Sequence, residues 1–129
     1  MKTHKKTHLL GFTLIELLAV MAIIALLLTI AVPRYFGSVD RSRETILRQD
    51  LVTMREALDK YYGDTGQYPD QLEDLTAKKY LRAIPRDPIT ESDTTWVVIP
   101  PTNGVKGAVY DVKSGATGNG LDGTAYSEW

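Results

Sequence analysis

The amino-acid sequence predicts an α+β fold, in which one long N-terminal helix packs on a small antiparallel β-sheet. An apolar run from residue 12 to residue 33 is long enough, at 1.5 Å per helical residue, to cross a bilayer core of about 30 Å. An amphipathic helical pattern extends this run to about residue 62. Two later segments, 94–100 and 107–115, are rich in β-branched and aromatic residues and are typical of strands. The sequence therefore predicts a helix with a membrane-spanning first half and an amphipathic second half.

Composition limits the number of domains and the class of partner. Of the 129 residues, about 95 follow Pro33, which is enough for one small domain with a modest core. Three of the 15 basic residues precede Gly11, so the remaining chain has 12 basic against 16 acidic residues and a net charge of −4. A nucleic-acid-binding protein would show a basic surface, so we expect no nucleic-acid partner. The lack of cysteine excludes disulfides, thiolate metal sites and thiol nucleophiles.

The first eleven residues, MKTHKKTHLLG, are basic and polar and precede the apolar run. A secretory signal peptide also begins in this way, but it is cleaved after its apolar region, where LTIAVP is only a weak site. A plain signal anchor explains the lysines by the positive-inside rule, with the basic end in the cytoplasm. Neither interpretation explains Glu16, because an ionised acid within an apolar span costs roughly 2.5 to 3.5 kcal/mol on insertion scales.

The stretch GFTLIELL, from Gly11 to Leu18, resembles the processing signal of type IV pilins and of the pseudopilins of type II secretion systems. In that family a prepilin peptidase cuts after the glycine on the cytoplasmic side and methylates the new amino terminus. The resemblance implies cleavage between Gly11 and Phe12, with Phe12 N-methylated. It divides the chain into a leader peptide (1–11), a transmembrane and assembly helix (12–33) and a periplasmic domain (34–129).

The resemblance also implies a role for Glu16, which becomes the fifth residue of the processed chain. In the family, this acid pairs with the terminal amine of a neighbouring subunit during filament assembly. Cleavage would create an ammonium at Phe12, and opposite charges attract far more strongly in a low-dielectric medium than in water. The two groups are four positions apart, so they could also meet within one chain. A third possibility is that Glu16 lies at the level of the lipid headgroups and is solvated there.

Beyond the span, apolar residues alternate at steps of four and three and predict a helical stripe that faces a core. The stripe consists of Leu47, Leu51, Met54, Leu58 and Tyr61. Pro33 favours a kink or local melting where the span meets the soluble helix. The sequence from Gly63 to Gly66 supplies the helix stop. A coiled-coil dimer is the alternative, but the heptad run is too short to favour it.

Charged residues four positions apart predict ion pairs on the other faces of this helix. The pairs are Glu44 with Arg48, Arg55 with Asp59, and Glu56 with Lys60.

The rest of the chain consists of short elements separated by turn residues. A brief second helix is expected within 70–81, with Asp70 as its N-cap. Two prolines make IPRDPIT (84–90) a loop. The two predicted strands should form an antiparallel pair joined by a turn at PTNG, and should lie on the apolar stripe because an isolated hairpin is marginal in water.

The second half of the chain narrows the resemblance to one group within this family. YYGDTGQYPDQLEDL, the Pro-Asp-Pro loop, WVVIP, VYDVKSG and the terminal tryptophan look like the major pseudopilins (G subunits) of type II secretion. This resemblance implies a pilin-like fold. It also implies a single-pass inner-membrane subunit that polymerises into a periplasmic filament, with minor pseudopilins and the inner-membrane secretion platform as partners. Many major type IV pilins close their C-terminal region with a disulfide, and the lack of cysteine therefore favours a pseudopilin.

A calcium site is implied by the same resemblance. In the G subunits, aspartates, a serine and backbone carbonyls bind calcium near the C-terminus, and calcium needs six to eight oxygen ligands. The resemblance makes Asp122 the best ligand, with Ser127, Asn119 and Asp111 as weaker candidates. Thr117 stands where the family often has a ligand aspartate, which implies a weaker site or a lost one. The alternative is a flexible loop without metal.

The sequence predicts a structural protein rather than an enzyme. His4 and His8 lie in the predicted leader, and the acid pairs in 70–74 and 87–91 fit a solvated surface better than general acid–base catalysis. We therefore expect a subunit of a type II secretion pseudopilus that drives protein secretion across the outer membrane. One alternative is a type IV pilus subunit with a role in adhesion, motility or DNA uptake. The other is a membrane-anchored periplasmic module that never polymerises and keeps residues 1–11.

Overall fold

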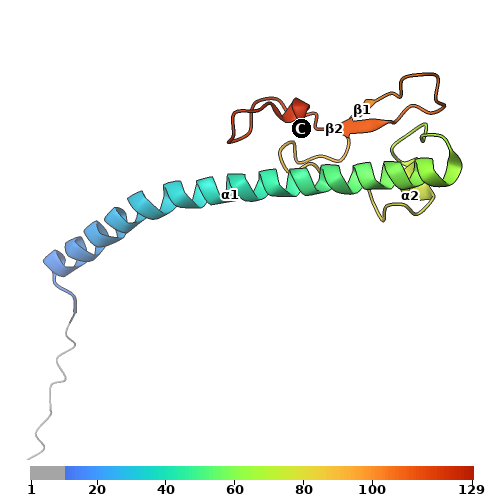
Figure 1. Cartoon of the computed structure of the whole chain (residues 1–129). Helices are drawn as coiled ribbons and strands as arrows, with labels where there is room; N and C mark the ends of the chain where they lie inside the picture. The colour runs from blue at the N-terminus through green and yellow to red at the C-terminus, as the bar shows by residue number, and fades with distance from the viewer. Residues whose placement is uncertain (1–10) are drawn as a thin grey trace, which may run out of the picture. The chain divides into compact units, whose positions relative to one another are not determined.

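The structure, a computed structural model, describes residues 11–129 (Figure 1). The predicted leader therefore lies outside the described residues, except for Gly11. The described elements are one long helix, one short helix, two strands and a terminal 3₁₀ turn: α1 (Leu14–Thr65), α2 (Asp74–Ala77), β1 (Val97–Ile99), β2 (Asp111–Lys113) and η1 (Tyr126–Glu128). The chain divides into two compact units, one that ends at Gly37 and one from Ser38 to Trp129. This arrangement confirms the predicted α+β class.

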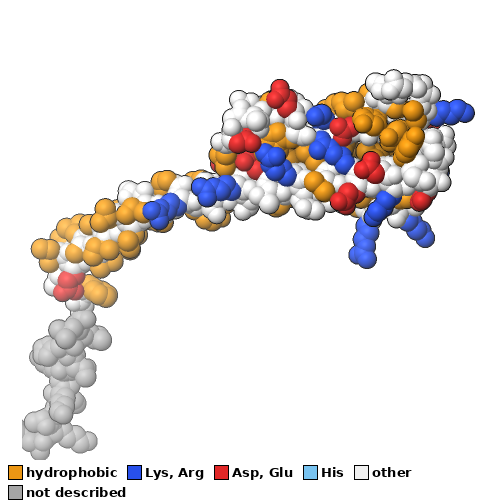
Figure 2. All heavy atoms as spheres, in the orientation of Figure 1, with side chains coloured by type: hydrophobic (Ala, Val, Ile, Leu, Met, Phe, Trp, Pro, Cys, Tyr) orange, Lys and Arg blue, Asp and Glu red, His pale blue; other side chains and the backbone are white. Residues whose placement is uncertain are grey.

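The described part of the first unit is an apolar helix with exposed side chains. Phe12 is 87% exposed, and the large apolar side chains that follow it as far as Phe36 are exposed as well (Figure 2). By length and composition, α1 is able to cross a membrane. Pro33 lies inside α1 without interrupting it, so the local melting that the sequence suggested is not seen. An apolar surface of this kind is stable only against lipid or against other apolar helices.

The second unit has its core on one face of α1, as the periodicity predicts. All five residues of the predicted stripe are buried, and Tyr61, the most exposed of them, is only 4% exposed. They form one cluster with Ala57 of the same helix and with Leu72, Leu75, Val109 and Val112 from the rest of the unit. The amphipathic half of α1 therefore supplies six of the ten residues of the buried cluster on which the later elements pack.

The end of α1 follows the predicted stop, with the break at Gly66. Gly66 has a φ of +74°, and its N–H donates to the carbonyl of Tyr62 at 2.8 Å. The hydroxyl of Thr65 donates to the carbonyl of Tyr61 at 2.7 Å. Left-handed backbone is easily adopted only by glycine, so the helix cannot continue past this residue.

The prediction that Asp70 caps the second helix is wrong. The helix α2 has only four residues and begins at Asp74, whose carboxylate accepts a hydrogen bond from the N–H of Gln71 at 3.2 Å. The carbonyl of Pro69 accepts hydrogen bonds from the N–H groups of Ala108 and Val109, both at 3.0 Å. These long-range bonds fix the chain before α2 in a loop, and no local capping pattern reveals them.

The two strands pair antiparallel, as predicted, although each has only three residues. Val98 of β1 lies opposite Val112 of β2, which is fully buried. The predicted turn is present at Asn103 and Gly104, which both have positive φ, but it lies within a longer loop. Gly107 in that loop has a φ of +114°, and a Cβ atom there would lie 2.2 Å from the carbonyl oxygen of Tyr68. Glycine is therefore required at residue 107, where the loop between the strands passes close to the backbone of Tyr68.

The Pro-Asp-Pro loop is organised by its aspartate. Asp87 is fully buried and accepts hydrogen bonds from the N–H groups of Ile89 (2.8 Å) and Thr90 (3.3 Å). Its other oxygen accepts a hydrogen bond from the hydroxyl of Ser114, just after β2. A buried carboxylate needs such donors, and here they join the loop to the sheet.

Candidate functional site

The N-terminal end of α1 is fixed by Thr13. Its hydroxyl oxygen accepts a hydrogen bond from the N–H of Glu16 at 3.2 Å, and its carbonyl accepts one from the N–H of Leu17 at 3.1 Å. Thr13 and Glu16 have the T-x-x-E spacing of a capping box. This cap was not among the predicted features, although the T-x-x-E spacing alone indicates it. The helix therefore begins directly after the predicted cleavage pair.

The predicted cleavage pair precedes the helix and is accessible. Gly11 and Phe12 are exposed and non-helical, and no other part of the described structure lies within 4 Å of a Cβ atom built on Gly11. A peptidase must bind its substrate chain outside a helix, and an exposed, non-helical segment meets this requirement. The geometry is compatible with the predicted processing.

Glu16 lies in the first turn of α1 and is exposed. It is the only charged residue from Leu14 to Val32. Within residues 11–129, its carboxylate has no hydrogen bond or ion pair, and only its backbone N–H is bonded, to Thr13. A carboxylate near a helix N-terminus is favoured by the helix dipole. The charge of Glu16 is therefore available for a group outside the described chain.

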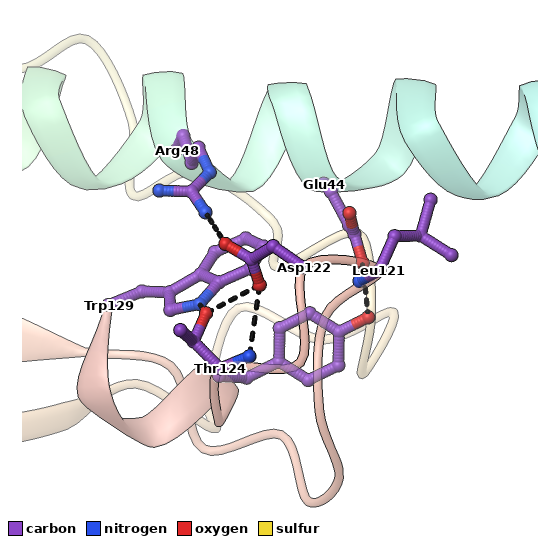
Figure 3. Close-up of polar contacts among 7 residues, drawn as sticks. Glu44, Arg48, Leu121, Asp122, Thr124 and Trp129 are labelled. Atoms are coloured by element: carbon purple, nitrogen blue, oxygen red, sulfur yellow. Dashed lines mark hydrogen bonds and ion pairs between the residues drawn. The ribbon is translucent and has the colours of Figure 1, made fainter.

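The C-terminal loop, residues 117–129, holds three of the four predicted calcium ligands, and its Asp122 is bonded on both of its oxygens (Figure 3). Oδ1 accepts hydrogen bonds from the N–H (3.0 Å) and the hydroxyl (2.6 Å) of Thr124. Oδ2 lies 3.0 Å from Nη2 of Arg48 on α1. The hydrogen bonds from Thr124, with a smaller contribution from Arg48, lower the pKa of Asp122.

Asp111 is bonded to a different arginine. Its Oδ1 accepts a hydrogen bond from Nε of Arg55 at 2.9 Å. Arg55 also donates to the carbonyls of Val112 (3.1 Å) and Trp129 (2.6 Å), so it joins β2 and the C-terminus to α1. One guanidinium can serve these three acceptors because it carries five N–H donors in a fixed planar fork.

The remaining candidate ligands, Asn119 and Ser127, are exposed. Within residues 11–129, no group of three or more His, Asp or Glu side chains is arranged to hold a metal ion. Calcium binding stays a prediction from the resemblance. A cation at Asp122 would have to compete with Arg48 for Oδ2.

None of the three predicted ion pairs along α1 is formed within residues 11–129: Glu56 and Lys60 do not pair, and three of the other charged residues contact β2 or the C-terminal loop instead. Arg48 and Arg55 pair with Asp122 and Asp111 rather than with residues four positions away. Glu44 accepts hydrogen bonds from the N–H of Leu121 (2.7 Å) and the hydroxyl of Tyr126 (3.0 Å). Partners more than 50 positions apart leave no spacing pattern in the sequence, which explains why the prediction failed.

Comparison with protein families locates a known motif at the N-terminus. Residues 10–32 match the family described as the prokaryotic N-terminal methylation motif. The match includes Gly11, Phe12 and Glu16 and most of the exposed apolar part of α1.

Comparison with individual proteins extends the similarity into the second unit. The chain is 32% identical over 102 residues to type II secretion system core protein G of Vibrio cholerae, which covers 67% of this chain and 68% of that protein. It is 32% identical over 94 residues to the protein of the same name in Pseudomonas aeruginosa, and 30% identical over 94 residues to that of Klebsiella michiganensis. In both cases the match covers 60% of this chain and 66% of the relative, just under two thirds. No solved structure matches the chain.

Proposed function

Since the chain belongs to the family of type II secretion system core protein G, we propose that it is a structural subunit of a pseudopilus. In this role, it polymerises in the cell envelope and drives secreted proteins across the outer membrane. The observation that carries the proposal is the N-terminal segment, where an accessible Gly11–Phe12 pair precedes an exposed apolar helix that carries a single carboxylate.

Processing is the first step of the proposed pathway. A prepilin peptidase cleaves between Gly11 and Phe12 and methylates the new amino group of Phe12. The methylation-motif match and the exposure of both residues support this step. The protein is then the substrate of an enzyme and performs no catalysis itself.

Membrane insertion places the amino terminus in the cytoplasm and residues 34–129 in the periplasm. The lysines before Gly11 support this orientation through the positive-inside rule. The exposed apolar half of α1 then lies in the inner membrane as a single span.

Assembly transfers this apolar surface from lipid to neighbouring subunits. Glu16 pairs with the amine of Phe12 in the adjacent subunit, which removes the penalty of an unpaired charge in an apolar surrounding. A head-to-tail contact of this kind does not close, so repetition gives a helical filament. Minor pseudopilins and the inner-membrane platform are the other partners of this filament.

The experiment that tests the pathway is intact-mass measurement of the protein purified from its own membranes, with sequencing of its N-terminal fragment. We expect a chain that begins at N-methylated Phe12. A chain that still begins at Met1 would reduce the protein to a membrane-anchored module. Deletion of the gene then separates the two filament roles, because loss of secretion indicates a pseudopilus and loss of surface filaments indicates a type IV pilus.

A further inference from the structure

The guanidinium of Arg48 on α1 contacts the C-terminal loop, residues 117–129, at two side chains, in addition to the hydrogen bond from Arg55 to the carbonyl of Trp129. Nη2 of Arg48 lies 3.0 Å from Oδ2 of Asp122, and the guanidinium carbon of Arg48 lies 3.8 Å from the centre of the Trp129 ring. The first contact is an ion pair, and the second is a cation–π contact. Arg48 therefore holds two points of the loop that are seven residues apart.

The two points are also joined to each other within the loop (Figure 3). The hydroxyl of Thr124 donates to Oδ1 of Asp122 and accepts a hydrogen bond from Nε1 of Trp129, both at 2.6 Å. A Cβ atom at Gly120 would lie 2.3 Å from the Trp129 ring. Arg48, Asp122, Thr124 and Trp129 thus form a closed ring of contacts, into which only glycine fits at residue 120.

A further attachment comes from Glu44, one helical turn before Arg48. Its Oε1 accepts hydrogen bonds from the N–H of Leu121 and the hydroxyl of Tyr126. Two neighbouring charges of α1 therefore bind the loop by complementary chemistry: Arg48 supplies donors to a carboxylate, and Glu44 accepts from a backbone and a side-chain donor.

This arrangement does not fit a calcium ion as the residues stand. Calcium needs six to eight oxygen ligands, and both oxygens of Asp122 are already bonded to donors. One of those donors is itself a cation, and Asp111 is bonded to Arg55. The positive charge that a metal would bring to Asp122 is already supplied by Arg48.

We propose that Arg48, together with Glu44, closes the C-terminal loop in place of a bound metal ion, so that this loop is ordered without calcium. The side chains of Arg48 and Asp122 are 54% and 50% exposed. An ion pair so exposed is weak by itself, and the stacking on Trp129 and the hydrogen bonds of Thr124 supply the rest. Loss of Arg48 should therefore open the loop and leave the core of the second unit folded.

Hydrogen exchange on the full chain in detergent micelles tests the proposal, with mass spectrometry used to follow peptides from 117–129. The wild-type protein is measured in EGTA and in millimolar calcium, the range in which extracellular calcium modules bind. Arg48→Gln removes the charge, and Arg48→Lys keeps the charge but loses the fork and most of the stacking. Arg43→Gln is the matched control, because Arg43 is on the same helix and pairs at 3.9 Å with Glu91, outside the loop.

We expect the wild-type loop to exchange at the same rate in EGTA and in calcium. Arg48→Gln should accelerate exchange in 117–129 by roughly fivefold to tenfold, while peptides from the buried stripe keep their protection. Arg48→Lys should give a smaller acceleration, and Arg43→Gln none.

Two results would overturn the proposal. One is faster exchange of the wild-type loop in EGTA than in calcium, which would show that the metal closes the loop; this comparison needs no variant to fold. The other is unchanged exchange in Arg48→Gln. Both readouts concern the single subunit, so they are independent of whether the protein assembles or supports secretion.

Discussion

Asp50 is a partly buried carboxylate on α1 whose environment disfavours its charge. Burial raises its pKa, and the nearby charge of buried Asp87 raises it further. A raised pKa in the folded state means that the ionised form reduces stability at neutral pH. The penalty disappears as the pH falls through the raised pKa, because the folded protein then holds the proton.

Asp50→Asn should therefore raise the melting temperature at neutral pH, by roughly 2–4 °C for a domain of this size. The gain should shrink towards zero in acid, where the wild-type carboxyl is protonated. Thermal unfolding followed by circular dichroism across this pH range measures both effects. Glu56→Gln, an exposed substitution on the same helix, is the control and should change little. A gain that does not depend on pH would contradict the electrostatic explanation.

Glu16 is a second single residue whose charge is expected to have a large effect, in this case on filament assembly. Glu16→Ala should leave membrane insertion intact, since an apolar residue is favoured in the span. Filament yield should fall by at least about tenfold, because the pair that fixes neighbouring subunits is lost. Membrane fractionation measures insertion, and sheared-filament yield measures assembly. Normal filament yield from this variant would remove the role assigned to the carboxylate.

At the scale of elements, the contact between α1 and the rest of the second unit determines stability. Leu51 is 1% exposed in the centre of the stripe, and Val52, its neighbour, is 45% exposed. Leu51→Ala should reduce the free energy of unfolding by about 2–5 kcal/mol, through lost burial and the cavity left behind. Val52→Ala, at this exposed position, should change it by less than about 0.5 kcal/mol. Urea unfolding of both variants makes the comparison, and equal losses would contradict the assigned face.

The loop between the strands gives a second pair of variants. Gly107→Ala places a Cβ atom 2.2 Å from backbone at Tyr68, whereas the same change at Gly104 meets nothing within 4 Å. Both residues have positive φ, so both substitutions add backbone strain of roughly 1–3 kcal/mol. Only Gly107→Ala adds the clash, and it should lower the melting temperature clearly more. Equal effects of the two substitutions would show that the backbone at residue 107 is not in close contact with the backbone at Tyr68.

The elements that follow from local patterns were predicted well. The period of the stripe identified the buried face of α1, and the glycine-containing stop located its end to within a few residues. The boundaries of α2 and the partners of Arg48 and Arg55 could not be predicted, because they depend on groups that are distant along the chain. The N-terminal residues were recognised because their motif is continuous in sequence. The roles of Gly11, Phe12 and Glu16 stay predictions.

At the scale of the whole molecule, folding and assembly depend on different parts of the chain. Every buried apolar residue of the described chain lies at or after Leu47, within the unit that begins at Ser38. The apolar residues from Phe12 to Phe36 are almost all exposed and contribute no core. Folding and assembly should therefore be separable by truncation.

A chain that begins at Ser38 should fold in water without detergent. Its core and its arginine contacts with the C-terminal loop are complete, and only the first turns of the shortened helix should fray. Its melting temperature should lie within about 5 °C of that of the full chain in detergent. Sedimentation should show a monomer, because the exposed apolar helix that would drive assembly is gone. A truncated chain that is unfolded would show that the apolar half stabilises the domain, and one that polymerises would show that assembly does not need this half.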